Sequence, residues 1–118
     1  IELVNEVYKL TRTLPDEERF VISSQMRRAA VSVPSNIAEG AARNTKREFV
    51  NYLHIAQGSL SELETHLEII MRLGYASRES TKDLDALMNR IDKLVTGLIK
   101  SVKTSHPSPL TPYAGKGK

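Results

Sequence analysis

The sequence predicts an all-α protein, an antiparallel up-down-up-down four-helix bundle with a proline-kinked second helix. Apolar residues recur at spacings of three and four along most of residues 1–104, which is the repeat of an amphipathic helix. The segments that interrupt this repeat are short, and short connections favour antiparallel neighbours. The sequence carries no strand-like alternation and no internal repeat that would favour another fold.

The first helix is predicted from the stripe Leu3, Val7, Leu10 and Leu14, and we expect it to end near Leu14 because Pro15 follows. At 1.5 Å per residue it is about 21 Å long, whereas the third helix spans about 43 Å. Because bundle helices match in length and the chain does not begin with Met, we expect this first helix to be truncated at its N-terminus.

The second helix is predicted to run from the acidic residues 16–18 to about Ala42, since negative charge favours a helix N-terminus. Pro34 removes one backbone hydrogen bond and crowds the preceding turn. We expect a kink between Ala30 and Pro34; the alternative is a break into two helices capped by Ser35 or Asn36. Its stripe consists of Ile22, Met26, Ala29, Ala30, Val33, Ile37 and Ala41.

The third helix is predicted to begin at Thr45, because Thr45-Lys46-Arg47-Glu48 has the T-x-x-E form of a capping box. It should end at Leu73, with Gly74 as terminator. Its stripe consists of Phe49, Tyr52, Leu53, Ala56, Leu60, Leu63, Leu67 and Ile70.

The last helix is predicted to begin at Ser80 or Thr81. Its apolar positions are Leu84, Leu87, Met88, Ile91, Leu94, Val95, Leu98, Ile99 and Val102.

Residues 105–118 are rich in Pro and Gly and are expected to form an extended tail outside the bundle domain, residues 1–104. The charge is divided in the same way. Residues 1–92 carry 12 basic and 14 acidic side chains, a net of −2, whereas residues 93–118 carry five lysines and no acid. The formal net charge of +3 therefore belongs to the C-terminal end, where the lysines either contact phosphates or remain solvated.

Composition excludes several classes of protein. The chain has no Cys, so disulfide scaffolds, zinc fingers and thiol catalysis are excluded. The sequence has no apolar run of about 20 residues and no signal peptide at its start, so we expect a cytoplasmic protein without membrane contact.

Motifs for catalysis are missing from the sequence. There is no phosphate-binding glycine loop and no nucleophile elbow. His66 lies four residues from Glu62, and no second helix supplies the Glu-x-x-His pair that a bundle metal site requires. A hydrogen-bonded or solvated histidine is the better interpretation, and we expect a protein that is not an enzyme and has no cofactor.

Two polar rows flank the apolar stripes, and polar groups at such seams must be paired. The rows are Arg28, Ser32, Asn36 and Glu39 on the second helix, and Ser59, Glu62 and His66 on the third. One interpretation is a buried network that fixes helix register, in which Arg28 or Asn36 meets Glu39 or Glu62. The alternative is contact with a ligand or nucleic acid.

Gly58 lies inside the third helix, where it costs about 1 kcal/mol relative to Ala. A gain from close helix packing is expected in return, with Ala29, Ala30 or Ala38 of the second helix as the approaching region.

Basic side chains gather around the connection between the second and third helices and on the last helix. Arginine suits bidentate phosphate contact, but acidic residues lie among them, so a solvated helix end is the alternative. The candidate nucleic-acid contacts are Arg27, Arg43, Lys46, Arg47, Lys93, Lys100 and Lys103.

Residues 28–43 read Arg-Ala-Ala-Val-Ser-Val-Pro-Ser-Asn-Ile-Ala-Glu-Gly-Ala-Ala-Arg, and residues 55–64 read Ile-Ala-Gln-Gly-Ser-Leu-Ser-Glu-Leu-Glu. Together with Phe49 and Leu53, these strings closely resemble the bacterial four-helix-bundle family encoded within intervening sequences of 23S ribosomal RNA genes. The resemblance covers about residues 1–103. Its motif positions are Arg28, Asn36, Glu39, Gly58, Ser59 and Glu62.

The resemblance implies a ring-like homopentamer and kinship with the accessory proteins of diversity-generating retroelements, whose basic pentamers engage nucleic acid and a reverse transcriptase. The net charge of −2 over residues 1–92 differs from those strongly basic relatives. The leading hypothesis is a non-enzymatic, homo-oligomeric protein that binds nucleic acid, RNA in particular. The alternatives are an assembly module that binds itself or another protein, and a bundle metalloenzyme.

Overall fold

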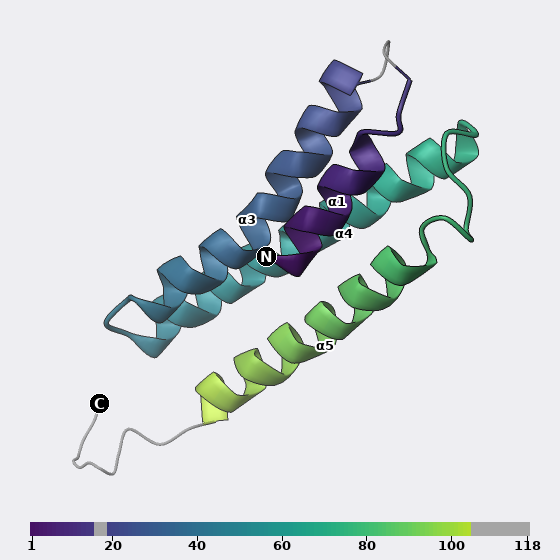
Figure 1. The fold of residues 1–118 in the computed structure, drawn as a ribbon. Helices are drawn as coiled ribbons and strands as arrows, with labels where there is room; N and C mark the ends of the chain where they lie inside the picture. The colour runs from purple at the N-terminus through teal and green to yellow at the C-terminus, as the bar shows by residue number, and fades with distance from the viewer. Residues whose placement is uncertain (16–18, 105–118) are drawn as a thin grey trace, which may run out of the picture.

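The computed structural model describes residues 1–15 and 19–104, and over that range it is an all-α bundle (Figure 1). The predicted fold class is confirmed. A short π-helical turn, η1, precedes the second long helix and was not predicted. The elements are α1 (Glu2–Thr11), η1 (Arg19–Ser23), α3 (Ser24–Ala41), α4 (Lys46–Arg72) and α5 (Lys82–Thr104).

The helices alternate in direction along the bundle, as Figure 1 shows for α3, α4 and α5. The most extensive contact joins α3 to α4, and α5 also packs against α4. α1 contacts both α3 and α5, so it occupies the corner of the bundle diagonal to α4. Among the described residues, no helix combines the length and the apolar character that a membrane span requires.

α1 ends at Thr11, three residues before the predicted end at Leu14. The Thr11 hydroxyl donates to the carbonyl of Val7 at 2.9 Å, and the chain then continues in tight turns. The N–H of Thr13 bonds the carbonyl of Leu10 at 3.0 Å, and that of Leu14 bonds the carbonyl of Thr11 at 3.3 Å. These i to i−3 bonds satisfy the last carbonyls of the helix, and Leu14 still reaches the core.

α3 runs without interruption through Pro34, so the alternative of two separate helices is wrong. The helix ends at Ala41, one residue before the predicted position. Packing of its buried face against α4 and α1 outweighs the loss of one backbone hydrogen bond at the proline. The acidic residues predicted to open this helix, 16–18, lie outside the described residues.

Both predicted caps of α4 are confirmed. The Thr45 hydroxyl accepts the backbone N–H of Glu48 at 3.1 Å and donates to the Glu48 carboxylate at 3.0 Å. At the other end, Gly74 has φ 83°, and the N–H of Tyr75 bonds the carbonyl of Ile70 at 2.9 Å. This 6→1 bond, with a left-handed glycine, is a Schellman motif. The helix therefore has fixed ends on either side of 27 residues.

The predicted apolar stripes form the core. α5 begins at Lys82, directly after the buried Thr81. Two predicted members are exposed instead: Ala41, the last residue of α3, and Leu94, whose side chain is 69% exposed on α5 while its neighbour Val95 is buried. The largest fully buried side chains of the hydrophobic core are Leu14, Met26, Leu53, Leu63, Leu67, Ile70, Met88 and Val7.

Candidate nucleic-acid interface

One end of the bundle brings together basic residues that are far apart in the sequence. The Gln57 amide of α4 donates to the Thr96 hydroxyl of α5 at 2.8 Å, which fixes the register of these antiparallel helices. Arg47 lies ten residues before Gln57, and Lys103 lies seven residues after Thr96. Both therefore lie toward the same end, where α3 turns into α4 and α5 finishes (Figure 1).

We call this region the basic end. Its members are all exposed and lie on the α3–α4 connection, the first turn of α4 and the last turns of α5. Glu39 and Glu48 also lie there, so the basic end carries an excess of three positive charges. The basic residues that define it are Arg43, Lys46, Arg47, Lys100 and Lys103.

Arg43 is held in place by two partners. Its guanidinium forms an ion pair with the Glu39 carboxylate, four residues earlier on α3. It also donates to the Tyr52 hydroxyl at 2.8 Å, and its Cζ lies 5.0 Å from the centre of the Tyr52 ring. Tyr52 chiefly, with Glu39, raises the pKa of Arg43 above its ordinary value. Arg43 is thus a positioned cation whose charge Glu39 partly compensates.

Two of the predicted contact residues lie away from the basic end. Arg27 is near the start of α3, where its Nε donates to the Thr11 hydroxyl at 2.8 Å and its guanidinium lies 4.5 Å from the Tyr8 ring centre. These contacts fasten α1 to α3. Lys93 lies three residues before Thr96, in the middle of α5. Neither residue joins the group at the end of the bundle.

The polar rows meet along the α3–α4 seam, but at its partly exposed edge. The hydroxyls of Ser32 and Ser59 are 2.8 Å apart, and the Asn36 amide donates to the Ser32 hydroxyl at 2.8 Å. Arg28 and Glu62 form an ion pair at 3.8 Å with side chains 68% and 42% exposed. Ion pairs this exposed contribute about 0–1 kcal/mol. The predicted pairing across the seam therefore exists for Arg28 and Glu62, although these side chains are not buried.

The predicted close packing at Gly58 is wrong. A Cβ placed at Gly58 would meet nothing within 4 Å, so no other helix approaches the backbone closely at this position. The close approach occurs at Gly40, which sequence reasoning missed. A Cβ there would lie 2.7 Å from the Tyr52 Cβ and 3.0 Å from a ring carbon of Phe49. The spacing from Val33 through Ile37 already placed Gly40 on the buried stripe of its helix.

His66 is buried and hydrogen-bonded through Nε2 to the Gln25 amide oxygen, at 2.9 Å. Its Nδ1 is also buried and has no partner among the described residues. Over residues 1–15 and 19–104, no three His, Asp or Glu side chains converge in an arrangement that fits a metal ion. His66 thus contributes to the contact between α3 and α4.

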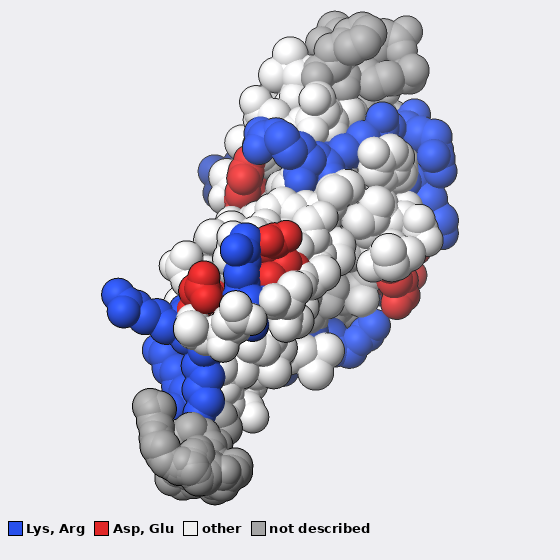
Figure 2. All heavy atoms as spheres, turned by 90° about the vertical axis from the view of Figure 1, so that its left-hand side faces the viewer, with Lys and Arg blue, Asp and Glu red and all other residues white. Residues whose placement is uncertain are grey.

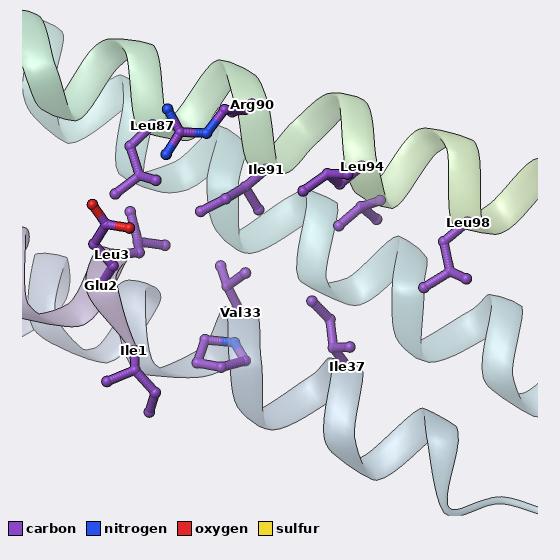
Figure 3. Close-up of a pocket in the computed structure, with 12 residues that line it drawn as sticks. Ile1, Glu2, Leu3, Val33, Ile37, Leu87, Arg90, Ile91, Leu94 and Leu98 are labelled. Carbon is purple, nitrogen blue, oxygen red and sulfur yellow. The ribbon is translucent and has the colours of Figure 1, made fainter.

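An apolar groove of about 410 Å³ opens between the N-terminal end of α1, α3 and α5 (Figure 3). Val33 and Ile37 of α3 face Ile91 and Leu94 of α5 across it. Glu2 and Arg90 are its charged lining residues, so most of its wall is hydrocarbon. Leu94 lines this groove, and its side chain is 69% exposed.

On the face that Figure 2 shows, the charged side chains do not form one continuous surface. Figure 2 shows Lys and Arg in separate groups, with Asp and Glu between them. A polyanion that followed the length of the bundle on this face would meet both signs of charge. Binding of a phosphate backbone is therefore favoured at a local cluster such as the basic end.

The comparison with known families agrees with the motif and the fold. The family of 23S rRNA-intervening sequence proteins matches residues 1–97. The chain belongs to this family. No curated protein matches the chain.

A solved structure similar to this 23S rRNA-intervening sequence protein comes from Bacteroides thetaiotaomicron and is described as a protein of unknown function from the S23 ribosomal protein family. It shares 30% sequence identity and has a TM-score of 0.77. The alignment covers 84% of this chain and 93% of the Bacteroides protein. The arrangement of four helices is therefore shared with this structure of the family. The description of that protein names no activity.

Proposed function

We propose that this member of the family is a non-enzymatic, homo-oligomeric helical-bundle protein that binds nucleic acid, RNA in particular, through its basic end. The observation that carries the proposal is the convergence of five basic residues from three segments at one end of the bundle. Arg43 is positioned there by Tyr52, and Arg47 lies in the first turn of α4, where the helix dipole also favours a phosphate.

Assembly into a homo-oligomer, with a pentamer as the preferred state, would present several copies of the basic end to one polyanion. Once one basic end has bound the nucleic acid, the other copies bind the same molecule without a new association step. Several basic ends of weak individual affinity therefore give a strong combined affinity. Light scattering of the intact protein tests the assembly. A particle mass that is a multiple of 13.2 kDa supports it, and a mass near 13.2 kDa in dilute buffer contradicts it.

RNA binding is tested by measuring the affinity of the intact protein for a single-stranded RNA from about 50 to 200 mM salt. Each phosphate contact contributes about 0.7 to the slope of log K against log salt for single strands. Replacing Lys100 and Lys103 by Ala should lower affinity and reduce the slope by about 1.4. Lys82→Ala, at the opposite end of α5, is the matched control and should leave the slope unchanged. Absence of salt-dependent RNA retention at 50 mM contradicts the proposal.

The second candidate function is a protein-interaction scaffold without nucleic-acid binding, which the apolar groove of Figure 3 favours. Leu94→Glu is the suitable test because this side chain is 69% exposed, so the change alters the groove and leaves the core intact. Ile99 is unsuitable since it is 8% exposed and a glutamate there would break the fold. Loss of partner binding in Leu94→Glu, together with no salt-dependent RNA retention by the unmodified protein, would favour the scaffold.

A further inference from the structure

The solvent-facing side of α5 carries a line of basic residues that starts at the basic end and continues to the middle of the helix. The spacings between Arg90, Lys93, Gly97, Lys100 and Thr104 are three, four, three and four, so these positions form one stripe. We call these five exposed residues the outer α5 stripe. The buried residues of α5 lie on the opposite side of the helix and are Leu84, Leu87, Met88, Val95 and Ile99.

The outer α5 stripe carries three positive charges and no negative charge. Asp92 is next to Lys93 in the sequence, but it turns toward α4, where the Gln57 amide donates to its carboxylate at 3.4 Å. Arg90 and Glu2 both line the apolar groove, yet no ion pair joins them in the described part of the chain. The positive charge of the stripe is therefore not balanced along its length.

The cations of the stripe are not explained by contacts within the protomer. Over residues 1–15 and 19–104, Arg90, Lys93 and Lys100 have no acidic partner. The helix dipole favours positive charge within the last turn, whereas Arg90 and Lys93 lie about three turns or more before Thr104. Several exposed cations elsewhere in the bundle each pair with a glutamate; these are Lys9, Arg28, Arg43, Arg72 and Lys82.

Gly97 lies at the centre of the stripe. Glycine is unfavourable inside a helix, and a Cβ at Gly97 would meet nothing within 4 Å, so no contact within the described protomer requires it. A glycine allows another molecule to approach the helix backbone closely. At Gly97 that molecule would lie between the positive charges of Lys93 and Lys100. The position therefore fits an anionic ligand that follows the helix.

The composition of the stripe favours a phosphate backbone over a protein surface. The cores of protein–protein interfaces are apolar and depleted in lysine, whereas the stripe contains no apolar side chain. Two copies of the stripe would repel each other, so it is not a surface that packs on itself. Lys100 also belongs to the basic end, so a strand bound there can continue along the stripe without meeting an acidic member.

We propose that the outer α5 stripe extends the RNA-binding surface, and that a single strand continues from the basic end past Gly97 to Lys93 and Arg90. The proposal rests on the proposed function and gives the bound strand a path. Thirteen residues separate Lys103 from Arg90, so this path follows α5 for about 20 Å. It requires the outer α5 stripe to stay exposed in the assembled protein.

The test replaces Arg90 and Lys93 by Ala in the full chain and measures binding of an oligouridine of about 15 nucleotides by fluorescence anisotropy. Both side chains are exposed, so the thermal unfolding midpoint should not change. Between about 50 and 200 mM salt, the slope of log K against log salt should fall by about 1.4, because two phosphate contacts are lost. Arg72→Ala combined with Arg78→Ala is the matched control. It removes the same charge from exposed positions at the opposite end of the bundle and should leave the slope unchanged.

A slope that the Arg90 and Lys93 changes leave unaltered, or that the control reduces equally, would overturn the proposal. The proposed function would stand if replacing Lys100 and Lys103 still reduced the slope, and the stripe would then be left to an acidic protein surface. An unmodified protein without salt-dependent RNA binding would overturn both.

If the variant without Arg90 and Lys93 does not fold, Gly97→Leu serves instead, because it keeps every charge and meets open space within the protomer. It should weaken binding of the oligouridine several-fold by preventing close approach to the helix. Gly58→Leu is its control, since Gly58 is equally open but lies on α4. Equal affinities of the two leucine variants would contradict the proposal.

Discussion

Glycines in this bundle have opposite roles that spacing along one helix does not distinguish. Gly40 lies where α3 and α4 touch, whereas Gly58 and Gly97 face open space. The predicted stripe of this helix did not include Gly40, although its spacing from Val33 and Ile37 fits that stripe. The contact with Tyr52 could not be predicted, because it depends on the register between two helices. The same holds for Arg43, whose partner Tyr52 is nine residues away and on another helix.

We expect Gly40→Ala to destabilise the protein. The new methyl group would lie 2.7 Å from the Tyr52 Cβ, an atom fixed to the α4 backbone, so the two helices must move apart. Overpacking of this kind costs about 1–3 kcal/mol. Chemical denaturation should show this loss of unfolding free energy. Gly97→Ala is the control and should raise the unfolding free energy by up to about 1 kcal/mol, since it improves helix propensity in open space. A neutral Gly40→Ala would contradict the close packing.

Among the helices, the sequence predicted the ends of α4 most accurately. Its two caps are local motifs, in which Thr45 and Gly74 bond groups within a few residues of themselves. The end of α1 was missed, because Pro15 limits where a helix can extend but does not fix where it stops. Thr11 ends it earlier, where its carbonyl also lies 3.5 Å from the Ser23 hydroxyl, a long-range contact that local spacing does not reveal.

The N-cap of α4 should contribute about 1 kcal/mol to the free energy of unfolding. Thr45→Ala removes the acceptor of the Glu48 N–H and the donor to the Glu48 carboxylate, leaving the first turn less well satisfied. We expect the free energy of unfolding to fall by that amount, as measured in urea. Thr65→Ala removes an exposed hydroxyl in the middle of the same helix and should cause no such loss. Equal effects of the two changes would show that capping does not stabilise α4.

At the scale of the whole molecule, the arrangement of the helices determines which members of a predicted stripe are buried. Val95 and Ile99 of α5 are buried, whereas Leu94 of the same predicted stripe is 69% exposed. Spacing along α5 did not separate these residues, because burial depends on which side of α5 its neighbouring helices cover.

Salt should separate the folding of this protein from the RNA binding that we propose. The ion pairs characterised over residues 1–15 and 19–104 all lie at the surface, and none of their side chains is less than 31% exposed. Such pairs contribute about 0–1 kcal/mol each, whereas the core is apolar and its burial is not screened by ions. We expect the free energy of unfolding to change by less than about 1 kcal/mol between 50 and 200 mM NaCl.

Over the same range, RNA affinity should fall roughly 100-fold if all five cations of the basic end contact phosphates. Denaturation and RNA titration of one preparation at both salt concentrations measure the two quantities together. A parallel loss of stability and affinity would mean that charge pairs hold the bundle together, contrary to the exposure of every pair described above. A constant affinity would mean that the basic end does not bind phosphate.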